Sequence, residues 1–283
     1  MLDNINLDAI FRMILNNVSF QKKMISVKQL SYAVGKKKLL NEISFNVAGG
    51  ELLSIIGANG AGKSTLLKLL CKEESASSGN IFIKDIPIAN YALKDLAKFR
   101  SVLSQHNTIS VSFTVNEIVM MGRYPHFERQ PSVEDVQIVR AAMEETGVTA
   151  FSGRDYNTLS GGEQQRVQLA RVIAQIYDQP QGILFLDEPT NGLDLLYQQQ
   201  ILNLARSLAD RGFCVVSILH DINFASRYSD KVLILKDGEK IAFGSPVEVI
   251  TCDNIHRAFN IQVQLMGGEN NRCPLVMPSA ILN

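Results

Sequence analysis

Residues 57–65 read GANGAGKST and match the phosphate-binding pattern G-x-x-x-x-G-K-[S/T]. The apolar run 51–56 before this stretch predicts a strand, and residues 63–72 predict a helix. In such a loop the backbone N–H groups turn inward around phosphate oxygens, and the helix N-terminus favours the anion. An ordinary glycine-rich turn is the alternative, but it does not require the strand before the loop or the helix after it.

The chemistry of this loop indicates a nucleotide with a magnesium ion. Lys63 is expected to reach the β- and γ-phosphates, and the hydroxyl of Ser64 to ligate Mg²⁺. The loop therefore predicts a nucleoside triphosphate and Mg²⁺ as cofactors. The candidate nucleotide-binding residues of the loop are Gly57, Asn59, Gly60, Ala61, Gly62, Lys63, Ser64 and Thr65.

The remainder of the chain predicts an α/β fold. Residues 183–186 and 213–219 are nearly continuous apolar runs, which are typical of parallel strands buried on both faces. Residues 232–235 and 240–243 flank Asp237-Gly238 and predict a hairpin, while the apolar alternation at 43, 45 and 47 predicts a half-buried strand. The segment from about 106 to 165 has a helical pattern. We therefore expect a mostly parallel sheet interrupted by a helical insertion.

Two carboxylates follow the buried run 183–186, and a histidine follows the run 213–219. Parallel strands end at the same edge of a sheet, so Asp187, Glu188 and His220 should lie together. Asp187 could hold Mg²⁺ through water, Glu188 could accept a proton from the attacking water, and His220 could contact a γ-phosphate. For the carboxylates the alternative is a solvated strand end, and for His220 it is a purely structural role.

The segment 159–166, LSGGEQQR, begins another predicted helix. Ser160 as N-cap and Glu163 three residues later form a capping-box pattern. Gly161 and Gly162 make the same helix start suitable for an anion. Both roles are compatible, and the loop could complete a site on a second subunit.

Composition narrows the class of protein. The formal net charge is zero, which argues against a nucleic-acid partner. The four cysteines have no C-x-x-C spacing and suit reduced thiols in the cytosol. No apolar stretch is long enough to span a bilayer, and no secretory signal is visible. If the chain serves transport, the pore is expected to belong to another chain.

Together these motifs resemble the ATP-binding cassette family from residue 24 to about 246, with residues 159–164 as its signature motif. The resemblance implies a P-loop core with an N-terminal antiparallel β part. It also implies that Tyr32 stacks on adenine, although a strand residue in the core is the alternative. Gln105 matches the glutamine that senses Mg²⁺ and water. Asp194 closes a D-loop whose first two positions, Asn191 and Gly192, depart from the commoner Ser-Ala.

The family resemblance also implies an assembly. Two cassettes pair head to tail, so each ATP lies between one P-loop and the signature loop of the other subunit, and a homodimer is expected. The partners would be integral membrane permease subunits and, indirectly, a periplasmic or surface substrate-binding protein. The protein would be peripheral on the cytoplasmic face of the bacterial inner membrane. A membrane subunit would dock near Phe113, for which a buried core role is the alternative.

The expected domain organisation has three parts: an N-terminal extension 1–23 that is expected to be poorly ordered, a cassette domain 24–250 with its helical subdomain at about 106–165, and a short tail 251–283. Within the family, four segments look like the ATPases of haem importers; these are residues 121–127, 160–171, 219–228 and 274–278. Importers of ferric siderophores and vitamin B12 share much of this pattern and remain the alternative. A non-transport regulatory ATPase is the alternative of a different class.

Overall fold

The computed structural model describes residues 23–104, 111–267 and 273–279. Its central sheet has the strand order β10-β9-β3-β8-β7-β6. Neighbouring strands from β9 to β6 run parallel, and only the edge pair β10–β9 is antiparallel. The strands are β3 (Leu52–Ile56), β6 (Arg100–Leu103), β7 (Ile183–Asp187), β8 (Cys214–Ile218), β9 (Lys231–Lys236) and β10 (Glu239–Gly244). The predicted parallel core and the predicted hairpin are both confirmed.

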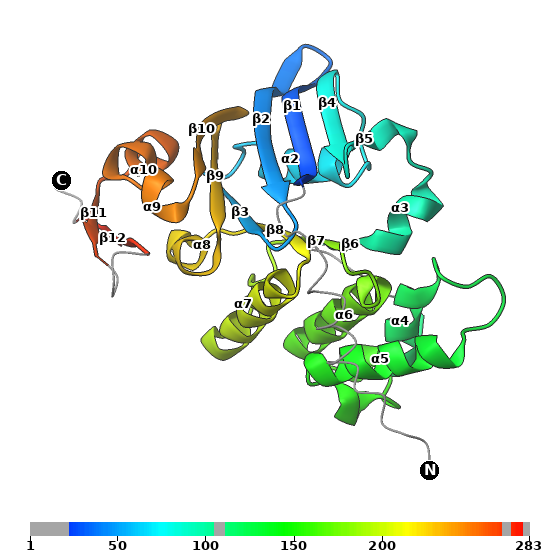
Figure 1. The fold of residues 1–283 in the computed structure, drawn as a ribbon. Coiled ribbons are helices and arrows are strands. Elements are labelled where there is room, and N and C mark those ends of the chain that lie inside the picture. The colour runs from blue at the N-terminus through cyan, green and yellow to red at the C-terminus, as the bar shows by residue number, and fades with distance from the viewer. Residues whose placement is uncertain (1–22, 105–110, 268–272, 280–283) are drawn as a thin grey trace.

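A second, antiparallel sheet is built from strands that lie before and after β3 in the chain, and it lies above the parallel sheet in Figure 1. Its order is β2-β1-β4-β5, with β1 (Lys23–Val34), β2 (Lys37–Ala48), β4 (Ser78–Ile83) and β5 (Ile86–Pro87). On β2 the side chains of Ile43, Phe45 and Val47 are buried, as their alternation predicted. The short strand β6 is preceded by helix α3 (Leu93–Phe99).

Three helices gather on the opposite side of the parallel sheet from the antiparallel sheet (Figure 1). They are α4 (Val115–Met120), α5 (Val133–Glu145) and α6 (Gly161–Ile176). Their apolar faces share one buried cluster that includes Ile118, Ala142 and Val172. The chain between β6 and β7 is therefore helical in the part that the structure describes, as its residue pattern predicted.

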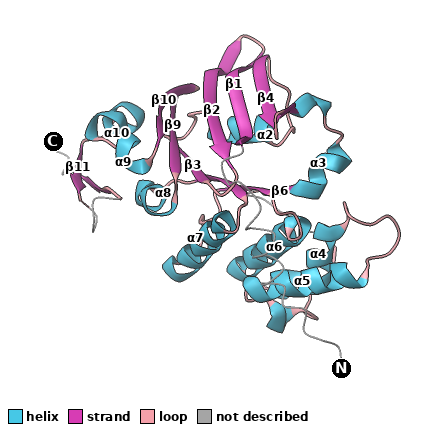
Figure 2. Cartoon of the chain, in the orientation of Figure 1, coloured by secondary structure: helices cyan, strands magenta, loops and turns pink. Residues whose placement is uncertain are grey.

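Of the remaining helices, α2 leads from the parallel sheet to the antiparallel one, α7 and α8 connect strands of the parallel sheet, and α9 and α10 follow it (Figure 2). Their bounds are α2 (Lys63–Leu70), α7 (Leu195–Asp210), α8 (Ile222–Tyr228), α9 (Pro246–Val249) and α10 (Cys252–Phe259). A two-stranded hairpin of β11 (Val263–Met266) and β12 (Leu275–Pro278) ends the described chain. In the described ranges, no helix combines the length and the apolar character that a membrane span needs.

Helix α2 is shorter than the predicted 63–72. Its last residue is Leu70 and its C-cap is Cys71, because Lys72 takes a left-handed conformation with φ 58°. Such a backbone cannot continue an α-helix. A capping box of Ser245 and Glu248 is present at the start of α9. Gln105 and residues 1–22 of the predicted extension lie outside the described residues.

Candidate nucleotide-binding and catalytic site

The loop 57–62 joins the buried strand β3 to helix α2, as the motif requires. The ammonium group of Lys63 is buried and donates hydrogen bonds to the carbonyls of Gly57 (2.8 Å) and Ala58 (3.1 Å). Gly62 is the N-cap of α2 with φ 99°, and no side chain caps the first N–H groups of the helix. Uncapped N–H groups at a helix N-terminus attract anions, so this end of α2 suits a phosphate group.

The turn of the β9–β10 hairpin contacts the phosphate-binding loop through a backbone hydrogen bond. The N–H of Gly238 donates to the carbonyl of Ala61 at 3.1 Å, and the Gly238 carbonyl accepts from the N–H of Asn41 at 2.8 Å. Gly57 also lies against β9, where an added Cβ atom would be 2.3 Å from the Leu235 carbonyl. The sequence predicted this hairpin but gave no sign that its turn contacts the phosphate-binding loop.

The carboxyl ends of β7 and β8 bring the predicted catalytic side chains together. The two strands are parallel and pair Asp187 with Ile218, so the residues that follow them emerge at one edge. Nε2 of His220 lies 2.6 Å from Oε1 of Glu188. Because an ionised carboxylate only accepts hydrogen bonds, the imidazole N–H is the donor. The Glu188 side chain is 13% exposed and that of His220 is 46% exposed, so the pair lies at the rim of the site.

Charges of opposite sign face each other across this edge. Burial raises the pKa of Asp187, and the negative charges of Glu188 and Glu73 raise it further. Burial lowers the pKa of Lys63, whereas the charges of Glu188 and Asp187 oppose that shift. The backbone of Glu188 is in the left-handed region, with φ 51°. Such a conformation costs free energy and is found most often where function requires it.

The described donor atoms fit a hard divalent cation. Oδ1 of Asp187 is buried and has no hydrogen-bond partner among the described residues. Ser64, at the start of α2, is exposed. Mg²⁺ prefers oxygen ligands, keeps several waters and needs only one or two protein ligands besides phosphate oxygens. Asp187 and Ser64 are therefore a suitable donor set, and no cluster of three or more acidic, His or Cys ligands occurs in the described part of the chain.

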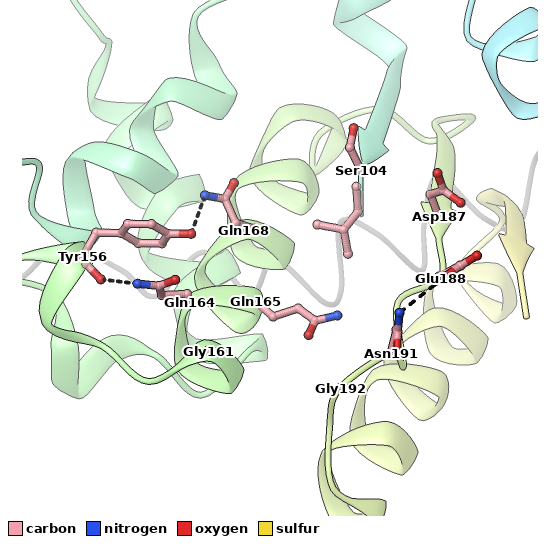
Figure 3. A pocket seen from close by; sticks show the side chains of 11 residues that line it. Ser104, Tyr156, Gly161, Gln164, Gln165, Gln168, Asp187, Glu188, Asn191 and Gly192 are labelled. Carbon is pink, nitrogen blue, oxygen red and sulfur yellow. Dashed lines mark hydrogen bonds between the residues drawn. The ribbon is translucent and has the colours of Figure 1, made fainter. Parts of the chain in front are cut away.

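The signature loop caps helix α6 as predicted. Ser160 Oγ accepts from the N–H of Glu163, and the Glu163 carboxylate accepts from the N–H of Ser160 at 2.8 Å. A cavity of about 320 Å³ lies between the start of α6 and the loop after β7. Figure 3 shows Gly161 and Glu188 among its lining residues. None of residues 57–65 lines this cavity.

Two further predicted residues have local partners. Tyr32 lies on β1, is half-buried against the core beneath it, and donates its hydroxyl proton to Glu74 at 3.0 Å. That hydrogen bond is the main reason that the pKa of Tyr32 is raised. Asp194 is the N-cap of α7, where its carboxylate accepts from the N–H of Tyr197 at 3.0 Å. The sequence did not predict this capping role.

Sequence reasoning missed two side chains that contact the loop after β7, which carries the candidate catalytic Glu188. Nδ2 of Asn191 lies 3.4 Å from Oε2 of Glu188, on the other carboxylate oxygen from His220. Gln165, on the first turns of α6, donates its amide N–H to the carbonyl of Pro189 at 2.5 Å. The departure of residues 191–192 from the commoner D-loop could have drawn attention to Asn191. No local pattern indicates the partner of Gln165.

Comparison with known proteins decides the family. A model described as "ABC transporter" matches residues 40–191, which is more than half of the chain. The chain belongs to the ABC transporter family of ATPases. The hemin import ATP-binding protein HmuV of Gloeobacter violaceus is 41% identical over 258 residues, covering 90% of this chain and 94% of the relative. HmuV of Methylobacillus flagellatus is 40% identical over 256 residues, covering 89% and 95%.

Solved cassette structures have the same fold. The dimeric structure of MJ0796, described as a bacterial ABC transporter cassette, superposes with a TM-score of 0.69 at 28% identity. The match covers 78% of this chain and 98% of that structure. The α/β cassette fold expected from the sequence is thus confirmed, and ATP is the nucleotide that the family binds.

Proposed function

We propose that this chain is the ATP-hydrolysing subunit of an importer of haem. One observation carries the catalytic part of the proposal: Glu188, held by His220, lies beside Asp187 and faces Lys63 of the phosphate-binding loop. The cargo is supported by relatives named as hemin import proteins that are 40–41% identical over about nine-tenths of the chain.

In this proposal residues 24–250 are the ATPase domain, the helical subdomain spans about 106–165, and the tail is 251–283.

Each of the described side chains has a separate role in the proposed hydrolysis. Lys63 and the N–H groups of the loop hold the terminal phosphates, while Tyr32 stacks on the adenine. Mg²⁺, held by Ser64 and Asp187, would neutralise charge that develops on the phosphates; Gln105, outside the described residues, is the third predicted ligand. Glu188 accepts the proton of the attacking water, and its contact with Nε2 of His220 fixes its orientation.

A homodimer completes the site. Ser160, Gly161 and Gly162 of one subunit bind the ATP that lies on the phosphate-binding loop of the other, and Asp194 lies at the subunit contact. The dimeric cassette structure with the same fold is a precedent for such pairing. ATP binding closes the dimer, and hydrolysis opens it.

The motion acts on separate chains. We propose integral membrane permease subunits as direct partners, with a periplasmic or surface substrate-binding protein as an indirect one. The protein would then be peripheral at the cytoplasmic face of the bacterial inner membrane. Phe113 is half-buried against the helical cluster, so both its core role and a docking role are compatible with its position. Nothing in this assembly requires nucleic acid or contact between this chain and haem.

The catalytic part is tested by Glu188→Gln in the full-length chain. Without the proton acceptor, turnover should fall by about 100-fold or more, because general-base catalysis contributes that much. ATP binding should persist, and the ATP-bound dimer should accumulate in size-exclusion chromatography. A variant that retains wild-type turnover would contradict the role of Glu188 and would favour the regulatory alternative. Arg140→Met, a change at an exposed helical site, is the control.

The cargo is tested with the cassette reconstituted with its permease subunits and binding protein. Haem, a ferric siderophore and cobalamin are added separately, and ATP hydrolysis is measured. Stimulation by haem alone supports the proposal. Stimulation only by a ferric siderophore or by cobalamin would preserve the motor function and replace the cargo.

A further inference from the structure

The loop between β7 and α7 is held by the side-chain amides of two glutamines. Nε2 of Gln165, from helix α6, donates to the carbonyl of Pro189 at 2.5 Å. Nε2 of Gln198, from helix α7, donates to the carbonyls of Thr190 (3.2 Å) and Leu193 (3.0 Å). Three backbone carbonyls directly after the catalytic strand are therefore fixed by side chains from the two helices beside the loop.

The two glutamines differ in what moves with them. Gln198 belongs to the helix that the loop itself enters, so its hydrogen bonds are local. Gln165 belongs to α6, four residues after Gly161, and the intact capping box of Ser160 makes the first turns of this helix one rigid unit with the signature loop. Arg166 on the same turn lies over the Tyr197 ring at 4.5 Å and adds a contact between α6 and α7.

Gln165 is oriented toward the catalytic loop. In Figure 3 its side chain points away from Gln168 and toward the loop that carries Glu188 and Asn191. Gln164, its neighbour, points the other way and donates to the carbonyl of Tyr156 at 3.1 Å. The two adjacent amides thus connect α6 to different parts of the molecule.

The acceptor of Gln165 is adjacent to the proposed general base. Pro189 directly follows Glu188, whose φ of 51° places it in a sparsely populated backbone conformation. Asn191 N–H also donates to the carbonyl of Glu188 at 3.1 Å, so the turn is compact. A shift of the Pro189 carbonyl would therefore rotate the backbone on which the Glu188 carboxylate is mounted.

We propose that Gln165 is a positioning residue that links the signature loop to Glu188 within one subunit. The inference rests on the proposed function, in which these two elements serve different ATP molecules of the dimer. When the signature loop of a subunit binds the partner's nucleotide, the Gln165–Pro189 hydrogen bond sets Glu188 for the subunit's own nucleotide. The hydrogen bond thereby couples the two hydrolysis sites.

The test compares the full-length chain with Gln165→Met, which keeps the shape of the side chain and removes the donor. Turnover should fall by about 3- to 10-fold, the effect of losing one positioning hydrogen bond. The ATP concentration for half-maximal binding should change by less than about 2-fold, and ATP-dependent dimers should still form in the Glu188→Gln background. A purely structural role would instead lower the unfolding temperature and nucleotide binding together.

The matched control is Gln175→Met on the same helix. Its Nε2 donates to the carbonyls of Ala97 (2.7 Å) and Arg100 (2.9 Å), away from the catalytic strand end. Its turnover should remain at the wild-type value. Equal turnover in Gln165→Met and Gln175→Met would overturn the inference. Gln165→Ala serves as a second variant if Gln165→Met does not fold.

A double-mutant cycle separates coupling from a local defect. If Gln165 transmits the position of the signature loop, then Ser160→Ala and Gln165→Met should together reduce turnover by less than the product of their separate effects. Strictly multiplicative effects would overturn the coupling. A wild-type chain that hydrolyses no ATP and loses nothing with Glu188→Gln would instead contradict the proposed function itself.

Discussion

Two regions of this molecule contain buried charged side chains, but they differ in whether the charged atoms have hydrogen-bond partners. At the end of β7, the buried Oδ1 of Asp187 has no hydrogen-bond partner among the described residues. Arg123 is the last residue of the short 3-10 helix Met121–Arg123. Its Nε donates to Asp135 at 2.8 Å, and its two terminal nitrogens donate to the two oxygens of Asp178 at 3.0 Å. Arg123 also donates to the carbonyl of Ala174 at 2.8 Å.

The difference distinguishes a structural cluster around Arg123 from the candidate binding site around Asp187. The Arg123 cluster, which we define as Arg123, Asp135 and Asp178, joins the helical segment around the turn 121–123 to α5 and to the end of α6. A buried charge whose partners are all present is tolerated, whereas a buried carboxylate with an unpartnered oxygen costs free energy unless a ligand pairs with it. Stability is therefore expected to depend on the first region and activity on the second.

The largest expected effect on stability comes from Arg123→Met. The side chain of Arg123 is 3% exposed, and its removal leaves Asp135 and Asp178 without their cationic partner. The free energy of unfolding should fall by about 3–5 kcal/mol, as measured by urea denaturation. Arg140→Met breaks an exposed pair with Glu144 and should change it by less than about 0.5 kcal/mol. Equal losses in the two variants would show that the cluster contributes no special stability.

Acid should weaken the Arg123 cluster. Burial alone would raise the pKa of Asp135, but hydrogen bonds from Ser132 and Arg123 outweigh it and hold that pKa below its usual range. Burial is likewise outweighed at Asp178, mainly by its hydrogen bond to Arg123, so the pKa of Asp178 is lowered too.

Proton linkage gives the direction in which folding stability changes with pH. Because both folded pKa values are depressed, the two carboxylates contribute their full stabilisation above about pH 5 and lose it as the pH falls through the folded values. Urea unfolding at neutral pH and near pH 3 should therefore show a smaller stability difference between the wild type and Arg123→Met in acid. A difference that grows in acid would contradict this sign.

The next largest effect on stability is expected from substituting Gly122, with Gly161 as the comparison. A Cβ atom at Gly122 would lie 2.1 Å from the Arg171 carbonyl, whereas at Gly161 nothing lies within 4 Å. Gly122→Ala should lower the free energy of unfolding by about 1–3 kcal/mol, because backbone must shift to admit the methyl group. Gly161→Ala should leave it within about 0.5 kcal/mol and should reduce ATP hydrolysis instead. The two variants are compared by thermal unfolding and by turnover.

The smallest expected effect on stability has the opposite sign. Because burial raises the pKa of Asp187, the ionised carboxylate is less stable in the folded protein than in the unfolded chain. Asp187→Asn should therefore increase the free energy of unfolding of the nucleotide-free protein by about 1 kcal/mol while ATP hydrolysis is lost. A destabilised variant would indicate that the folded protein itself pairs with this carboxylate.

Much of the site could be predicted because it follows from local sequence. The phosphate-binding loop, the capping box of Ser160 and the apolar runs that lead to Asp187 and His220 depend on residues within about ten positions of each other. Parallel strands share one carboxyl edge, so the juxtaposition of Glu188 and His220 could also be predicted. The helix end at Leu70 could not, because the left-handed backbone of Lys72 has no sequence signal.

By itself, the sequence determined the α/β core and pointed to the loop chemistry and to the candidate catalytic side chains, since these depend on residue type and short-range periodicity. Only the tertiary structure decided which distant groups meet. It placed the Gly238 turn under the phosphate-binding loop, Gln165 on the carbonyl of Pro189, and two aspartates around Arg123. These contacts join residues 12 to 177 positions apart, and no local pattern encodes them, because a side-chain amide or guanidinium can pair with any acceptor that the fold brings within reach.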